Sequence, residues 1–511
     1  MSDLPADYYE RSDQLHDLLN NEPIEAVRLA REILWDTVGK AERLYLMQLR
    51  ASILVDGGSA IEDRDAISEG LELFRELHAQ FPTLSLAYNL ANGLIAFTSR
   101  PSRNKNWLDH QERTREHRAE ARRYLWKVAE ASEAESSLKT QALTNLANQF
   151  SNSFRLSEAH DIRLAALQID PENGVAAGTA ARELLWLYSQ GGCSELTHLE
   201  AGMLARLAHR HQDKIVQYAG VKAAKELAAL ASQFADLPKR SAHKDPFIAW
   251  VERERLTLGP TVELVDPKLG KLDWLMLPDI LERDLEAECV PPPVFSMFNS
   301  LKSDYILARD LAWRGDQGDS WPATGRFSGT LDGATYGPNT SALILAHRTA
   351  LDLLDKVAVT ANHYFELGQN PKKIYFGNMW RESVGKKVGV GPLFKPVSKL
   401  IIDGATALYG LVELAEDYDG ETGILRPQKN LRNAGTHRFV VLHDFGDIKK
   451  CRQASEIERH EHDDFTKDVL RALRVARSAI QMLALSITQH EKVLRARTTG
   501  FIGSLNVPDY E

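Results

Sequence analysis

Apolar and alanine residues recur with a helical period over most of the first 236 residues. The pattern is clear in EAVRLAREILW (25–35), AISEGLELFRELHAQF (66–81) and ARELLWLY (181–188). A spacing of three and four residues places these side chains on one face of a helix, which can then pack on a neighbouring helix. The pattern predicts an all-α array of stacked helices, with a groove suited to a peptide or a partner protein. No catalytic pattern occurs in this part of the chain.

One stretch of the array, residues 141–173, resembles a tetratricopeptide repeat. Its packing positions are Leu146, Ala147, Phe150, Ala159 and Ala166, and Pro171 closes the unit. Arg163 departs from the pattern, because an aromatic residue is usual there. A weaker copy ends in Gly70, Phe74, Leu77 and Pro82, and the loop 56–65 is expected to interrupt its helix pair. A generic helical bundle without repeats remains the alternative.

The chain has 511 residues, too many for one hydrophobic core, so two or three domains are expected. The net charge of −9 argues against a general nucleic-acid coat protein but leaves room for a local basic cleft. Three widely separated cysteines offer neither a disulfide framework nor a CxxC metal site. The acidic N-terminus lacks the apolar core of a signal peptide, and no apolar run could span a bilayer. These features favour a cytoplasmic protein without a membrane partner.

Changes in composition divide the chain into an array (1–236), a connector (237–293) and a second helical domain (294–511). In the last part we expect helices at 298–313, 341–365, 399–418, 428–445 and 463–494. Two long inserts interrupt them. The first, 314–338, is rich in glycine and predicted to be mobile, and the second, 371–399, is basic and aromatic.

The stretch Arg432-Asn433-Ala434-Gly435-Thr436-His437 lies near the start of the helix expected at 428–445. The spacing of arginine and histidine alone means little, because Arg155…His160 and Arg206…His211 repeat it in the array. Those two pairs are expected to be ordinary surface residues without a role in the chemistry. What distinguishes Arg432 and His437 is Asn433 directly after the arginine, and a bundle of helices around the motif.

These residue types suit RNA cleavage. RNA carries its own nucleophile, the 2′-hydroxyl, so the protein has to move protons and stabilise phosphorane charge. Histidine titrates near neutrality, so His437 can act as general acid or base. Arg432 can hold phosphate oxygens, and Arg438 adds a second cation. Asn433 lies four residues before His437, on the same helix face, and could orient its ring. Ala434 and Gly435 are expected to leave room for a substrate.

An Arg-Asn-x-x-x-His motif in an all-α bundle resembles the signature of the HEPN superfamily, over roughly residues 294–500. The resemblance implies a metal-independent endoribonuclease without cofactors, whose products are 2′,3′-cyclic phosphate and 5′-hydroxyl ends. It also implies a homodimer that places two motifs across one cleft. Helical repeats followed by such a domain are similar to bacterial toxins or defence effectors that destroy RNA when triggered.

Two further segments could contribute to function. The second insert carries Lys372, Lys373, Lys386 and Lys387 among aromatic residues, including Tyr375, Phe376, Trp380 and Phe394. Such a mixture suits single-stranded RNA, although a solvated lysine loop is equally compatible with it. The segment 458–464 offers His460, His462, Asp463 and Asp464, which could bind a metal, but a solvated helix start is favoured. We therefore predict no metal site.

Alternatives remain open. Arg432 and His437 could simply pair with carboxylates in a helical core. The chain could be a non-catalytic scaffold whose second helical domain binds RNA, a nucleotide or a protein. It could also be the regulatory partner of a nucleotidyltransferase, as some HEPN proteins are.

Overall fold

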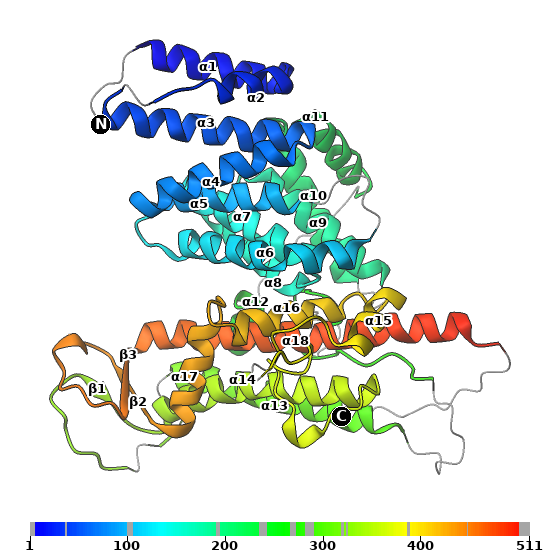
Figure 1. Cartoon of the computed structure of the whole chain (residues 1–511). Coiled ribbons are helices and arrows are strands. Elements are labelled where there is room, and N and C mark those ends of the chain that lie inside the picture. The colour runs from blue at the N-terminus through cyan, green and yellow to red at the C-terminus, as the bar shows by residue number, and fades with distance from the viewer. Residues whose placement is uncertain are drawn as a thin grey trace. The chain divides into compact units, whose positions relative to one another are not determined.

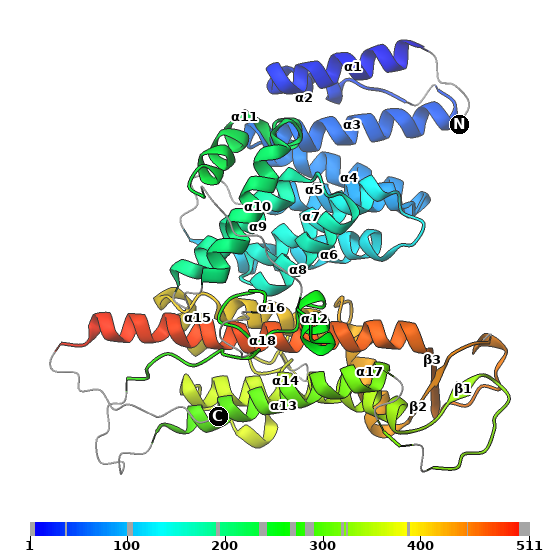
Figure 2. The same cartoon turned by 180° about the vertical axis from the view of Figure 1, so that it is seen from behind.

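The computed structural model describes residues 6–35, 38–99, 106–190, 195–234, 243–265, 272–281, 291–317, 321–322, 325–385, 389–446 and 448–499. Contacts divide the chain into two compact units (Figures 1 and 2). One unit holds residues 1–149 and 168–170, and the other holds 150–167 and 171–511. The structure is predominantly helical, so the predicted all-α class is confirmed. The predicted domain limits at 236 and 293 stay predictions. None of the described helices combines the length and apolar character needed to cross a membrane.

The helices of the first unit are α1 (Ala6–Asn21), α2 (Pro23–Arg31), α3 (Lys40–Ile61), α4 (Arg64–Gln80), α5 (Leu84–Thr98), α6 (Trp107–Glu130) and most of α7 (Ser136–Asn152). The expected loop at 56–65 is wrong, because α3 continues to Ile61. Gly57 is buried, and a Cβ there would come within 2.6 Å of Val27. At Gly70, a Cβ would come within 2.8 Å of the Ala51 carbonyl. These glycines therefore serve close helix packing and do not mark a loop.

The second unit begins with further array helices and the connector: α8 (Leu156–Ile169), α9 (Gly174–Ser189), α10 (Glu195–Arg210), α11 (Gln212–Ala231) and α12 (Pro246–Arg253). The packing positions predicted for residues 141–173 are all buried. Arg163, the departure from the repeat pattern, is buried as well. Its guanidinium pairs with Glu183 and donates to the Ser151 hydroxyl at 2.7 Å, so an ion pair replaces the usual aromatic contact.

The domain that carries the motif contains α13 (Pro293–Gln317), α14 (Pro338–Tyr364), α15 (Lys395–Asp403), α16 (Leu408–Asp419), α17 (Arg426–His437) and α18 (His462–Arg497), with two short 3₁₀ turns, η1 (Pro371–Lys373) and η2 (Ile448–Lys450). Helices α13, α14 and α18 pack on one another (Figure 1). The single helix expected at 399–418 is two helices. The break falls at Gly404, whose φ of +126° side chains rarely adopt.

A small sheet, which the sequence analysis did not predict, follows α17. Its strands are β1 (Ala334–Thr335), β2 (Phe439–His443) and β3 (Ile457–Glu461), in the order β1-β2-β3. β1 pairs antiparallel to β2, and β2 pairs parallel to β3. The helix expected at 428–445 therefore ends at His437. The run Phe-Val-Val-Leu is rich in residues that favour strands. It pairs with β1, which precedes it in the chain, and with β3, which follows it.

Helix α8 is joined to α16 and α18 by buried polar contacts inside the second unit. Arg155 donates to Glu158 at 2.6 and 2.8 Å and pairs with Asp417 of α16. Asp161 pairs with Arg477 of α18. Arg155 and His160 are fully buried, and His160 lies 2.9 Å from Glu200. The prediction that Arg155 and His160 are surface residues is therefore wrong. Arg206 is half-buried and donates to the Phe234 carbonyl at 2.8 and 3.1 Å.

Candidate functional site

Helix α17, which carries the motif, is anchored in the core at its first half. The Gln428 side chain accepts a hydrogen bond from the His347 ring of α14 at 2.9 Å and donates to Asp468 of α18 at 2.6 Å. Burial lowers the pKa of His347 to about 4, so its ring is neutral near pH 7. Burial also raises the pKa of Asp468. This bridge through Gln428 fixes the rotation of α17 and thereby the direction of each motif side chain.

Arg432 faces α14 and is held by two carboxylates. Its Nε donates to Asp352 at 2.7 Å and its Nη2 to Asp355 at 3.0 Å. Burial works against the charge, but Tyr418, Asp355 and Asp352 outweigh it and raise the pKa of Arg432. The guanidinium is therefore a fixed cation whose side chain remains 22% exposed. A phosphate could reach it, in competition with the two aspartates.

His437 and Asn433 are exposed, and His437 is the last residue of α17. The motif thus lies at the end of its helix, and the prediction that it lies near the start is wrong. No hydrogen bond joins Asn433 to His437 within the described part of the chain. Five residues at about 100° each place Arg432 and His437 about 140° apart around the helix. One copy of the motif consequently does not direct both side chains at a single phosphate.

The residues around the motif behave differently from one another. Arg438 pairs with Glu458 of β3, and its side chain is 42% exposed. Ala434 is buried and so offers no room for a substrate, contrary to the expectation. Gly435 packs near α14, where an added Cβ would lie 3.5 Å from Ile344. Asn433 and His437 therefore lie on the side of α17 that is accessible to solvent.

The second insert lies beside Arg432. Asp355, which holds Arg432, also accepts the backbone N–H of Phe376 at 2.8 Å. Phe376 and Trp380 are buried in the core, so the expectation that these two rings stack on bases is wrong. Phe394 is partly buried and Tyr375 is exposed. Lys372 and Lys373 are exposed and remain candidates for RNA contacts, while Lys386 and Lys387 lie outside the described residues.

Among the residues that the structure describes, one set of metal-ligand side chains comes together. Single ligand atoms of Asp332, His443 and Cys451 all lie within 4.8 Å of one another. A carboxylate, an imidazole and a thiolate are groups that Zn²⁺ could bind. However, the Arg459 guanidinium already lies 3.1 Å from Asp332 and 3.2 Å from the His443 ring. Arg459 therefore supplies the positive charge there, and a metal ion would have to displace it. The sequence analysis missed this set because its members are far apart in the chain.

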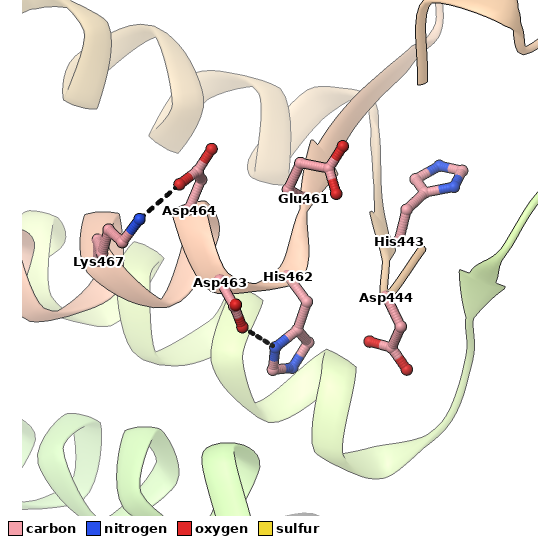
Figure 3. A pocket seen from close by; sticks show the side chains of 7 residues that line it. All are labelled: His443, Asp444, Glu461, His462, Asp463, Asp464 and Lys467. Carbon is pink, nitrogen blue, oxygen red and sulfur yellow. Dashed lines mark hydrogen bonds and ion pairs between the residues drawn. The ribbon is translucent and has the colours of Figure 1, made fainter. Parts of the chain in front are cut away.

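The segment 458–464 contributes to a different feature, an open hollow of about 440 Å³. It is lined by His443, Asp444, Glu461, His462, Asp463, Asp464 and Lys467. Figure 3 shows His443 and Asp444 extending from the end of β2, and the others from the junction of β3 with α18. Four carboxylates against one lysine disfavour a phosphate group. His460 does not join this lining and instead lies near the Phe465 ring.

Asp352, Asp355 and Gln428 are the site residues that sequence reasoning missed. A signal existed for the first two. They are three residues apart in α14, so they lie on one face of that helix and present two carboxylates together. Gln428 carries no such signal, because a glutamine in the first turn of a helix is ordinarily exposed.

The family comparison agrees with the resemblance inferred from the motif. The family model described as LA2681-like HEPN matches residues 286–490, which include Arg432, Asn433 and His437. No curated protein and no solved structure matches the chain. The predicted membership in the HEPN superfamily is confirmed for this segment: residues 286–490 are an LA2681-like HEPN domain.

Proposed function

We propose that the HEPN domain is an endoribonuclease whose site contains His437, Arg432 and Asn433. The observation that carries the proposal is the exposed His437 at the C-terminal end of α17, with the complete motif inside a HEPN domain. The 2′-oxygen attacks the adjacent phosphorus and loses its proton to a base, and the 5′-oxygen leaves with a proton. This gives a 2′,3′-cyclic phosphate and a 5′-hydroxyl without water or metal.

His437 moves the protons and Arg432 stabilises the phosphorane oxygens. Asn433 is exposed like His437 and would orient the histidine ring in the complex with RNA, because no hydrogen bond joins the two side chains in the part of the chain that the structure describes. Because Arg432 and His437 leave α17 in different directions, a second motif from another copy of the chain would complete the site. We therefore include a homodimer in the proposal. In this proposal the protein is a cytosolic toxin or antiviral effector, and a protein or peptide bound to the helical array triggers cleavage.

One observation favours the rival, a non-catalytic helical domain. Arg432 is paired with Asp352 and Asp355, as a purely structural arginine would be. The exposure of His437 counts against one form of that rival, in which both Arg432 and His437 pair with carboxylates in a helical core. Variants of His437 and Arg432 therefore distinguish the alternatives.

The test is cleavage of total RNA by the full chain and by His437→Ala and Arg432→Ala, with the ends of the products identified. Loss of a general acid–base residue lowers the rate by roughly 10²–10⁴-fold. His363→Ala is the matched control, because His363 is also exposed near the end of a helix of the same domain. Full cleavage by a folded His437→Ala protein would show that the histidine is not catalytic.

A further inference from the structure

Large aromatic side chains are exposed on the small sheet and its adjoining segments. We define the β-arm as residues 325–337 and 438–461, of which residue 447 lies outside the described residues. The exposed rings are Phe327 at 58%, Tyr336 at 43%, Phe439 at 69% and Phe445 at 72%. Rings in water at several neighbouring positions contribute nothing to the core, and such groups mark binding surfaces.

Phe439 is the first residue of β2 and Phe445 lies two residues after that strand, while Tyr336 directly follows β1 and Phe327 precedes it. Phe327 and Tyr336 are stacked, with centroids 6.3 Å apart and planes at 25°. Thr335 pairs with Leu442, so the chain direction carries Tyr336 toward the Phe439 end of β2. At the other end, the backbone N–H of Asp444 donates to the Gly333 carbonyl at 3.1 Å, next to Phe445. Figures 1 and 2 show the three strands together at one end of the domain, beside α17.

The β-arm continues directly from the motif. Helix α17 ends at His437, and the exposed Phe439 is the first residue of β2. Of the four rings, Phe439 therefore lies two residues from His437, and a strand that stacks on Phe439 would pass beside the motif. Arginines precede two of the rings, in Arg326-Phe327 and Arg438-Phe439. Cations beside rings are the combination that binds single strands, in which backbone phosphates meet the charge and bases stack on the rings.

The charge of the β-arm sets what kind of binding to expect. Several carboxylates balance its cations: Glu458 pairs with Arg438, Asp332 pairs with Arg459, and Asp444 and Glu461 line the acidic hollow. The β-arm is thus no general phosphate-binding surface. Its affinity for RNA has to come mainly from stacking, which only unpaired bases permit.

We infer that the β-arm binds unpaired bases of the RNA strand next to the cleaved bond, and so restricts the substrate to single-stranded RNA. This inference rests on the proposed function, because it names the substrate of that site. It places base recognition on the β-arm, and not on the second insert, whose Phe376 and Trp380 are buried.

The experiment measures RNA binding by the full chain in a His437→Ala background, so that the probe is not cut. The probe is a labelled single-stranded oligonucleotide, compared with its duplex. Phe327→Ala and Phe439→Ala should each weaken single-strand binding about 5- to 100-fold and leave duplex binding unchanged. The slope of affinity against salt should stay the same, since a ring releases no counterions. Tyr375→Ala is the matched control, an exposed ring outside the β-arm.

Replacement by another ring or by an aliphatic residue separates stacking from simple apolar docking. Phe439→Trp should restore single-strand binding and Phe439→Leu should not. Equal binding by wild type and the alanine variants, or full rescue by leucine, would overturn the inference. The inference would also be overturned if the wild-type protein were a dimer and Phe439→Ala a monomer, because the β-arm would then bind a second copy of the chain.

The two proposals can fail separately. A wild-type protein that binds single strands through the β-arm but cuts no RNA contradicts the ribonuclease, and of the inference it leaves only the binding of unpaired bases by the β-arm. Cleavage that depends on His437 but not on the β-arm rings contradicts only the inference. Thermal unfolding of each variant checks that the fold is intact.

Discussion

Replacing Arg155 by alanine tests the buried polar contacts between α8 and the HEPN helices. Arg155 is fully buried, donates twice to Glu158 and pairs with Asp417. Its guanidinium also lies 4.1 Å from the centroid of the Phe150 ring. Arg155→Ala would leave two carboxylates buried without their cation. Breaking a buried ion pair in this way costs about 3–5 kcal/mol, so we expect a loss of that size in the free energy of unfolding.

The assay is urea unfolding of the full chain, followed by a probe in the second unit because the two units need not unfold together. Arg253→Ala is the control. Arg253 pairs with Glu254, but its side chain is 67% exposed, so its loss should have little effect. Asp417→Asn keeps the Arg155–Glu158 pair and should cost less than Arg155→Ala. A loss below about 1 kcal/mol for Arg155→Ala would refute the reasoning, because an uncompensated buried charge cannot be that cheap.

Four further predictions concern metal, pH, the limits of the folded domain and salt. Excess chelator should leave RNA cleavage unchanged; cleavage that stops and returns with a divalent ion would contradict the proposed chemistry. Since the pKa of His347 is about 4 in the folded state, the unfolded chain takes up a proton first as pH falls from 6.5. Stability should therefore drop by up to about 3 kcal/mol between pH 6.5 and 4, and His347→Gln should remove that part of the pH dependence in denaturation curves. A fragment 290–511 lacks α8 and exposes Asp417 and Arg477, so circular dichroism and solubility should show it to be less folded than a fragment 150–511. Neutralising Lys372, Lys373, Lys386 and Lys387 together should lower the salt dependence of RNA binding by about one unit per lost phosphate contact, and identical slopes would exclude that surface.

Local signals in the sequence were sufficient for most helices and for the motif. Helical periodicity identified the array and the long helix α18, and the helix expected at 341–365 is α14, which begins three residues earlier, at Pro338. Arg432, Asn433 and His437 were found from their order and their helical surroundings. These features depend on residues a few positions apart in the chain, so they can be recognised from a single sequence.

The errors arose where distant segments determine the local structure. Residues 439–443 become a strand because 334–335 and 457–461 lie on either side to pair with them. The aromatic residues of 371–399 are buried because that insert packs on α14, where Asp355 binds the backbone of Phe376. Arg155 is buried because Asp417 lies 262 positions later in the chain and meets it. Local composition along the chain does not indicate which distant segments will pair.

The charges around Arg432 bear on how such a site could have low activity before it is triggered. Two aspartates already hold Arg432, and Asp352 also pairs with Arg348, so an approaching phosphate has to compete with these carboxylates for the guanidinium. To bind Arg432 it must displace Asp352 or Asp355, or arrive with a second cation that offsets them. A second motif from another copy of the chain would supply such a cation. It would also bring a histidine that faces the same phosphate as Arg432. Slow cleavage by a single copy would then follow from the site itself, and assembly of two copies would be the step that a trigger on the array has to control.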